Sequence, residues 1–185
     1  MGRFGELSSP FWESYKSILI VRDAWERYFS HVRMSMMLRN RNMNLSEDHI
    51  DVEDMVMFRG DFRQKEFRRA ASNFLTQHLV PDFRRNPTNC TAEVLEKAIA
   101  AVDRFSYVLN FFAMAEESSY LLEVGFGIRF AEFRENRHNG RAKTPELNPR
   151  LRKAFDSMNE CDNLVVAYVN ERVGRIASCL RDNSY

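Results

Sequence analysis

A run of four aliphatic residues that ends on an Arg-Asp pair constrains the fold of this chain more than any other feature. The segment KSILIVR, Lys16 to Arg22, shows no alternation of polar and apolar residues, which is typical of a strand buried on both faces in a parallel sheet. Asp23 then occupies an N-cap position, and Glu26, three residues later, completes a capping box. The sequence therefore predicts a strand that is followed at once by a helix from about Ala24 to Met37.

A second strand is predicted at Phe105 to Phe112, FSYVLNFF, with a helix on each side of it. Thr91 can cap the preceding helix, and the following helix, AEESSYLLEVGF, should end at a glycine cap, Gly125 or Gly127. The preceding helix is amphipathic. Its apolar face carries Val94, Leu95, Ala98, Ile99 and Val102.

Two more helices are predicted after a charged loop that runs from about Glu132 to Pro149. Pro149 suits the first position of a helix, where a missing backbone donor costs little. Asp162 can cap a final helix. One side of that helix carries Val165, Val169, Val173 and Ile176.

The order of strands and helices favours an α/β fold over a helical bundle, with a small, partial parallel sheet and a large helical complement. A chain of 185 residues fits one domain, residues 1–185. No apolar run approaches the roughly 20 residues that span a bilayer, and the amino-terminal segment has no apolar core of a signal peptide.

The stretch between the first helix and Leu79 allows several interpretations. Residues 39–54 form a polar, aperiodic segment in which Asp48, Asp51 and Asp54 could bind a cation, although a solvated acidic loop explains them more simply. Residues 58–79 mix arginines with phenylalanines, which predicts that part of this stretch is a helix with a basic outer face. The same mixture could grip nucleic acid, but a net charge of +1 gives no global field for that, and we expect no nucleic-acid partner.

The three cysteines are odd in number and match no zinc or redox spacing, so we expect free thiols at Cys90, Cys161 and Cys179, with room for one disulfide. Two glycosylation sequons, at Asn44 and Asn89, have meaning only if the chain enters the secretory pathway. None of the four histidines has a partner at metal or triad spacing, so no metal site is predicted.

The arginine at the end of the first strand is the strongest candidate for a functional residue. Ligands of open α/β sheets bind just beyond the carboxyl ends of the strands, and the fixed charge and forked donors of arginine suit phosphate. Ser30 lies seven residues after Asp23, on the same helix face and roughly 10 Å below its start by the helical rise. Arg22 and Ser30 could therefore contact one phosphate from two sides. The alternative is that Arg22 pairs with a nearby carboxylate while Ser30 faces solvent.

The segment IVRDAWERYFSHVR resembles the 3′-phosphate-binding segment of the sulfotransferases that use 3′-phosphoadenosine 5′-phosphosulfate. In that segment an aliphatic strand is followed by Arg, by Asp or Asn, by a second Arg, and by Ser eight positions after the first Arg. Arg22, Arg27 and Ser30 match these positions. Three downstream segments are similar to those of the membrane-associated carbohydrate sulfotransferases. They are NFLTQHL, AIAAVDRFSYVLNFFAMAEESSYLLE and LRKAFDSMNECDNLVVAYVNERV.

This resemblance implies a sulfotransferase fold of the P-loop-NTPase type, in which Arg22 and Ser30 hold the 3′-phosphate of the sulfate donor. Arg27 would assist, although it could instead pair with Asp23 or Glu26. The reaction implied is transfer of a sulfuryl group to a hydroxyl, with a carbohydrate as the expected acceptor. Relatives with an anchor at the amino end work in the Golgi membrane or lumen.

The chain also departs from the family. Ala24 replaces the usual proline, Gln77 stands where the group carries Arg, and Phe111 and Phe112 occupy the place of a glutamate. The 5′-phosphosulfate loop of the family lies upstream of the present segment, and only 15 residues precede the first strand. We therefore expect a chain without that loop and assign no catalytic base. The alternative is a catalytically inactive remnant that acts as a protein-interaction domain.

Overall fold

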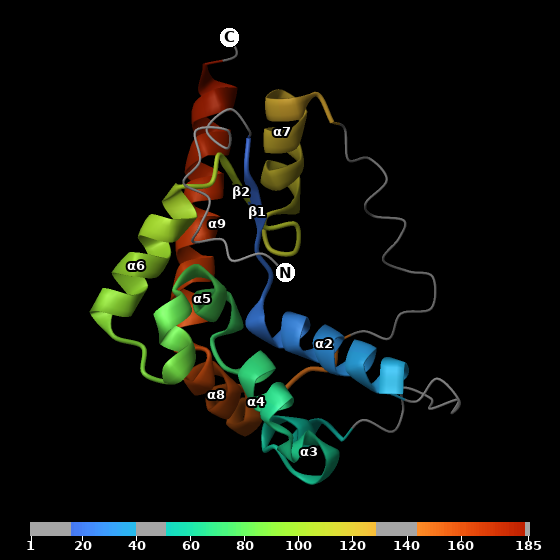
Figure 1. Cartoon of the computed structure of the whole chain (residues 1–185). Coiled ribbons are helices and arrows are strands. Elements are labelled where there is room, and N and C mark those ends of the chain that lie inside the picture. Colours follow the sequence, from blue (N-terminus) through green and yellow to red (C-terminus); the bar gives the residue numbers. More distant parts are fainter. Residues whose placement is uncertain (1–15, 40–50, 129–143, 184–185) are drawn as a thin grey trace.

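A computed structural model gives the structure of the chain and describes residues 16–39, 51–128 and 144–183. The fold is mixed α/β, mostly helical, with one small parallel sheet (Figure 1). This agrees with the predicted fold class at that level. Within the described residues, no helix is long and apolar enough to cross a membrane.

The sheet consists of β1 (Ile18–Ile20) and β2 (Tyr107–Leu109), paired in parallel with Ile18 opposite Tyr107 and Ile20 opposite Leu109. Both strands were predicted, and both are shorter than their aliphatic runs suggest. The prediction that β1 is covered on both faces is wrong for the described residues, because the side chains of Ile18 and Ile20 are 40% and 57% exposed. Leu19, on the other face of this strand, is half-buried and packs against the core.

The helices follow the sequence in an order close to the predicted one, and Figure 1 shows β1 running directly into the first described helix. The helices before β2 are α2 (Ala24–Arg39), α3 (Val52–Val56), η3 (Gly60–Arg63), α4 (Lys65–Ala71), α5 (Phe74–Leu79), η4 (Pro81–Arg85) and α6 (Ala92–Asp103). Those after it are α7 (Ala115–Phe126), α8 (Pro149–Met158) and α9 (Glu160–Asp182).

Local capping signals determine several helix ends, as predicted. The Asp23 carboxylate accepts hydrogen bonds from the backbone N–H groups of Trp25 and Glu26, at 2.9 and 3.0 Å. The Thr91 hydroxyl accepts from the backbone N–H of Val94 at the start of α6. Gly127 ends α7 in the left-handed conformation, with φ of 69°, which a glycine adopts without steric cost.

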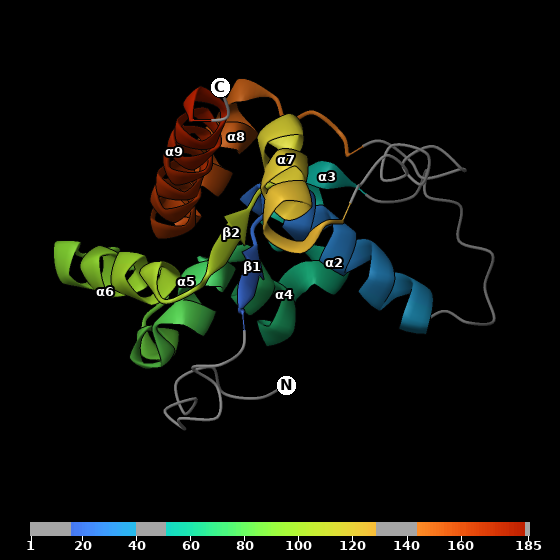
Figure 2. The ribbon, with the colours of Figure 1, turned by 90° about the horizontal axis from the view of Figure 1, so that it is seen from above.

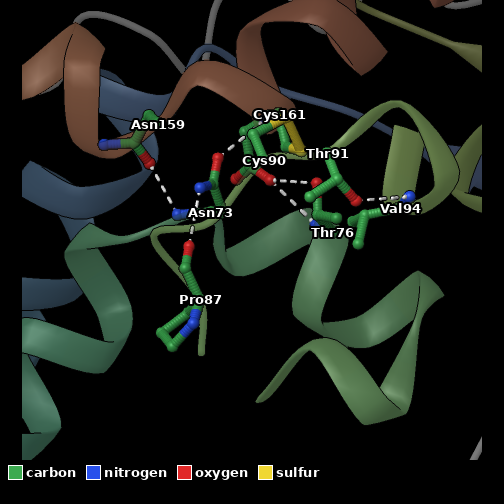
Figure 3. Close-up of a disulfide and its surroundings, with 9 residues drawn as sticks. Asn73, Thr76, Pro87, Cys90, Thr91, Val94, Asn159 and Cys161 are labelled. Atoms are coloured by element: carbon green, nitrogen blue, oxygen red, sulfur yellow. Dashed lines mark hydrogen bonds between the residues drawn. A yellow bond between two sulfur atoms is a disulfide. The ribbon is translucent and has the colours of Figure 1, made fainter. Parts of the chain in front are cut away.

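Residues 58–79, part of which was predicted to be a helix, contain η3, α4 and α5. Asn73 adopts a left-handed backbone conformation with φ of 43° and separates α4 from α5. Its side chain is fully buried and compensates for this strained conformation, because the amide Nδ2 donates to the carbonyl of Pro87 at 2.7 Å and the Oδ1 accepts from the N–H of Asp162. Figure 3 shows Asn73 between Asn159 and Pro87. Long-range partners therefore decide where this helix breaks.

The core has two hydrophobic clusters. One joins β2 to α6, α7 and α9, and α7 and α9 both contact β2 beside the sheet (Figure 2). It is centred on Val102, Leu109, Val165, Val169 and Val173, which are fully buried. The second joins α2, α3, α4 and α8, where Phe155 packs against Trp25 and Tyr28 with ring centroids 5.2 and 5.7 Å apart.

The expectation of free thiols is wrong at two of the three cysteines. Cys90 and Cys161 form a disulfide that ties the segment before α6 to the start of α9 (Figure 3). Cys179 is free and exposed. Cys90 and Cys161 are 71 residues apart in the sequence. A local spacing motif cannot indicate a pair that is so far apart in the sequence. The spacing of the cysteines therefore favoured three free thiols.

Asp162 does not cap the final helix, which begins two residues earlier, at Glu160. The carboxylate of Asp162 is 1% exposed and caps α5 instead, because it accepts from the N–H groups of Leu75 and Thr76 and from the Thr76 hydroxyl at 2.8 to 2.9 Å. The predicted apolar side of α9 also differs at its end. Ala177 is buried there, while Ile176 is 38% exposed.

Candidate functional site

A cavity of about 590 Å³ lies beyond the carboxyl ends of both strands, just after Ile20 in β1 and Leu109 in β2. This is the edge at which open parallel sheets bind ligands. The cavity is formed by the start of α2, the turn after β2, the segment before α8, and α8 and α9 themselves. It is lined by Asp23, Trp25, Glu26, Asn110, Phe112, Ala113, Thr144, Pro145, Glu146, Leu147, Arg152, Val166 and Asn170.

The charged groups of the cavity are mostly acidic. Among the described lining residues, Asp23, Glu26 and Glu146 contribute three carboxylates, and Arg152 contributes one guanidinium. Arg152 Nη2 lies 3.6 Å from an oxygen of Asp23, so the Asp23 carboxylate partly neutralises the charge of Arg152. The described part of the lining therefore suits hydroxyl and amide groups better than a phosphate.

Arg22 lies at the edge of this cavity, between two of its lining residues. Its Nε donates to the carboxylate of Glu26 at 3.4 Å, and its guanidinium carbon lies 4.2 Å from the centre of the Phe112 ring. The Arg22 side chain is 32% exposed, and among the described residues its two Nη groups have no hydrogen-bond partner. The guanidinium is thus held in place while its terminal donors stay available to a ligand.

Ser30, the second predicted phosphate ligand, lies on α2 four residues after Glu26. Glu26 and Ser30 therefore lie on one side of that helix, while Arg22, two residues before the helix begins, pairs with Glu26. Ser30 is half-buried. The structure therefore puts a carboxylate between the two residues that were predicted to share a phosphate.

Arg27, the third predicted ligand, is engaged with the protein interior. Its Nη1 donates to the carbonyl of Ala70 at 2.8 Å, and its Nη2 lies 3.7 Å from the carboxylate of Asp162. The guanidinium carbon also lies 4.6 Å from the centre of the Phe74 ring. Burial lowers the pKa of Arg27, and the Asp162 and Asp23 carboxylates act in the opposite direction. These contacts connect α2 to α4, α5 and α9, and give Arg27 a structural role.

The turn after β2 supplies polar groups to the cavity. Asn110 is 1% exposed, and its Oδ1 accepts from the N–H groups of Phe112 and Ala113. Its Nδ2 donates to Oδ1 of Asn170 on α9 at 2.9 Å. Sequence reasoning missed both asparagines. The available signal was an asparagine directly after a buried strand, where its side chain can close a turn.

The wall opposite this turn is held by Trp25. The Trp25 Nε1 donates to the carbonyl of Pro145 at 2.8 Å, which fixes the segment before α8 against the first turn of α2. Trp25 is 4% exposed, so its ring belongs to the core and is not free to stack on a ligand. Glu146, the next residue after Pro145, contributes its carboxylate to the cavity from this segment.

Two of the positions at which the chain departs from the pattern it resembles, Gln77 and Phe112, have structural partners. Gln77 is 4% exposed and its Nε2 donates to the carbonyls of Arg69 and Ser72, closing the turn between α4 and α5. Phe111 is buried, whereas Phe112 is 39% exposed and packs on Arg22. The Gln77 amide thus stabilises the helix break between α4 and α5.

The remaining candidates of the sequence do not gather at this site. His31 is exposed on α2, and His78 contacts the carbonyl of Phe74 on its own helix. In residues 16–39, 51–128 and 144–183, no three metal-binding side chains lie close enough to hold an ion. Asp51 caps α3 by accepting from the N–H of Asp54, and Asp48 lies outside the described residues, as do His49 and His138.

The phenylalanines of the arginine-rich segment belong to the core. Phe62 and Phe67 are 6% and 1% exposed, and their rings meet edge to face at 5.6 Å. Arg68 covers the ring of Phe58 at 5.6 Å. These rings are occupied by the protein itself and offer no stacking platform for bases.

Comparison with known proteins adds no relative. No family model matches the chain, and neither the curated proteins nor the solved structures contain a match.

Proposed function

We propose that the chain is a sulfotransferase-like domain that binds the 3′-phosphate of 3′-phosphoadenosine 5′-phosphosulfate at Arg22 and Ser30. The observation that carries the proposal is the environment of Arg22. The guanidinium stands at the carboxyl end of a parallel strand, is fixed by Glu26 and Phe112, and has no hydrogen-bond partner for its Nη groups among the described residues. A pre-positioned fork of two donors suits a phosphate oxygen pair.

Two further features support the proposal. The strand order, a parallel pair in which β1 continues into a capped helix, fits a P-loop-NTPase-like sheet and its ligand edge. Ser30 supplies a hydroxyl two turns along the same side of α2. Arg27 is left out of the donor site, because its Nη1 donates to Ala70 and its Nη2 lies near Asp162.

Glu26 sets the main energetic cost of such a site. Its carboxylate pairs with Arg22 at 3.4 Å and would lie beside a bound phosphate. Like charges a few ångströms apart repel each other, although solvent screens groups that are about one-third exposed. A phosphate must therefore gain more from Arg22 and Ser30 than it loses beside Glu26.

The cavity next to Arg22 is the proposed place of the acceptor. Its carboxylates can accept hydrogen bonds from several hydroxyls, and the half-buried Asn170 contributes an amide Nδ2 that can donate, as a carbohydrate requires. In sulfuryl transfer the acceptor oxygen attacks sulfur in line with the leaving phosphate, and a base removes its proton. The 3′-phosphate of the donor is thus assigned to Arg22 and Ser30, and a carbohydrate hydroxyl to the cavity. No residue is assigned as the base.

Calorimetric titration with 3′-phosphoadenosine 5′-phosphate, the product form of the donor, tests the proposal. Replacement Arg22→Ala removes a charge-assisted phosphate contact, which should cost about 1.5 to 3 kcal/mol, about a tenfold to hundredfold loss in affinity. Arg59→Ala is the matched control, because Arg59 forms a similar pair with Glu53 at 3.3 Å on a distant helix.

The proposal fails if Arg22→Ala binds the nucleotide as tightly as the parent, or if both arginine variants lose affinity equally. Absence of binding by the parent would favour the alternative, a catalytically inactive relative that acts as a protein-interaction domain. The acidic lining of the cavity is the observation that favours this alternative.

A further inference from the structure

We propose that Asn89 carries an N-linked glycan, and that the glycan is attached before the disulfide between Cys90 and Cys161 closes. The triplet Asn89-Cys90-Thr91 is a glycosylation sequon in the segment between η4 and α6. Asn89 is exposed, and its side-chain amide makes no hydrogen bond in the described part of the chain. A glycan at this position would extend into solvent without displacing a core contact.

The middle residue of the sequon is itself a disulfide cysteine. Disulfides form and persist in oxidising compartments such as the lumen of the endoplasmic reticulum and the cell exterior. The bond between Cys90 and the fully buried Cys161 therefore indicates that the chain folds in such a compartment. N-linked glycans are added in the same compartment. The disulfide and the sequon are separate features, and both point to that compartment.

The folded segment is a poor acceptor for the transfer. Cys90 is tied to α9, and the Thr91 hydroxyl accepts the backbone N–H of Val94 at 3.3 Å (Figure 3). The backbone N–H of Asn89 also donates to the carbonyl of Asn86 at 3.3 Å. A glycosyltransferase needs the triplet in an extended form with the threonine hydroxyl free. Attachment therefore has to precede both the disulfide and the capping of α6.

The chemistry of the two steps is separate. In the first, the amide nitrogen of Asn89 forms a bond to the anomeric carbon of a lipid-pyrophosphate-linked oligosaccharide, and the bond from that carbon to the pyrophosphate oxygen breaks. The nitrogen loses one proton and the lipid pyrophosphate leaves. In the second, the thiols of Cys90 and Cys161 lose two electrons and two protons to the disulfide of an oxidoreductase. The second step removes the substrate conformation that the first requires.

This inference does not depend on the sulfate-donor site. Its test is secretion of the full chain behind a cleavable leader, with the Asn44→Gln replacement throughout, because the other sequon lies outside the described residues. The expected result is a mobility shift on denaturing gels that peptide N-glycosidase removes. The shift should be lost in Asn89→Gln and in Thr91→Ala. Absence of the shift in the Asn44→Gln protein would overturn the site.

The order of events has its own test. Cys161→Ser abolishes the disulfide but leaves the triplet Asn89-Cys90-Thr91 intact, so it should raise the glycosylated fraction. Cys179→Ser, at the free and exposed cysteine, is the matched control and should leave that fraction unchanged. Because the glycan is read on denatured chains, a folding defect does not obscure the result. An equal and incomplete glycosylated fraction in parent and Cys161→Ser would overturn the order.

Discussion

The buried carboxylate of Asp162 should be the most sensitive polar group of this fold. It accepts from the N–H groups of Leu75 and Thr76, from the Thr76 hydroxyl, and lies 3.7 Å from Nη2 of Arg27. Replacement Asp162→Ala leaves two N–H groups at the start of α5 without their acceptor and the guanidinium of Arg27 without its nearby carboxylate. Each of these groups then stays removed from water without that partner, which lowers the free energy of unfolding.

The expected loss in the free energy of unfolding is about 3 to 5 kcal/mol, the range for removing one partner of a buried ion pair. Asp162→Asn keeps one carbonyl acceptor and removes only the charge, so it should cost less, about 1.5 to 3 kcal/mol, the range for charge-assisted hydrogen bonds. Asp156→Ala is the matched control, since Asp156 is 37% exposed and pairs with Arg152 at 2.9 Å. Such a surface pair is worth less than about 1 kcal/mol.

Urea unfolding of the oxidised proteins, followed by circular dichroism, measures these differences. With a slope of about 2 kcal/mol per molar urea, Asp162→Ala should shift the midpoint down by about 2 M. All variants must retain the disulfide between Cys90 and Cys161, so that only the carboxylate differs. A shift no larger than that of Asp156→Ala would refute the role of Asp162 as the cap of α5.

Further predictions concern the disulfide, the aromatic cluster and the donor site. Cys161→Ala should cost about 4 kcal/mol, by the chain-entropy estimate for a separation of 71 residues, while Cys179→Ala stays within about 0.5 kcal/mol in the same urea assay. Phe155→Ala, at a fully buried ring, should cost about 3 to 5 kcal/mol, and a loss below 1 kcal/mol would contradict the packing described. Glu26→Gln should tighten binding of 3′-phosphoadenosine 5′-phosphate by a few fold, because a like charge beside the phosphate is removed; weaker binding in calorimetry would instead make Glu26 the residue that positions Arg22.

Features that depend on neighbours along the chain could be predicted from the sequence. The β1 strand, the cap at Asp23, the cap at Thr91 and the glycine end of α7 rest on signals within four residues. Their physical causes, an unsatisfied N–H group or a left-handed backbone, are local as well. The parallel pairing followed from the aliphatic character of two separated runs.

Features that depend on partners far along the chain could not be predicted in this way. Asp162 has an ordinary N-cap signature for its own helix. Its carboxylate oxygens instead accept from N–H groups of α5, 86 to 87 residues away in the sequence. The disulfide and the amide pair of Asn110 with Asn170 also join distant segments. Sequence spacing carries no information on such pairs, because packing alone brings them together.

At the candidate site, too, features set by neighbouring residues could be predicted and features set by distant partners could not. The position of Arg22 at the end of β1 followed from the local strand-to-helix pattern, and so did the alternative that Arg22 pairs with a carboxylate, here that of Glu26. The interior role of Arg27 did not, because its partners Ala70 and Asp162 lie on other helices. The acidic lining of the cavity likewise combines segments that lie far apart in the sequence.

The most direct measurement for the central claim compares two nucleotides on two proteins. The parent should bind 3′-phosphoadenosine 5′-phosphate more tightly than adenosine 5′-phosphate, since only the first carries the phosphate that Arg22 would hold. Arg22→Ala should reduce this preference by about tenfold or more and leave the affinity for adenosine 5′-phosphate unchanged. An equal preference in parent and Arg22→Ala would contradict a 3′-phosphate site at the end of β1.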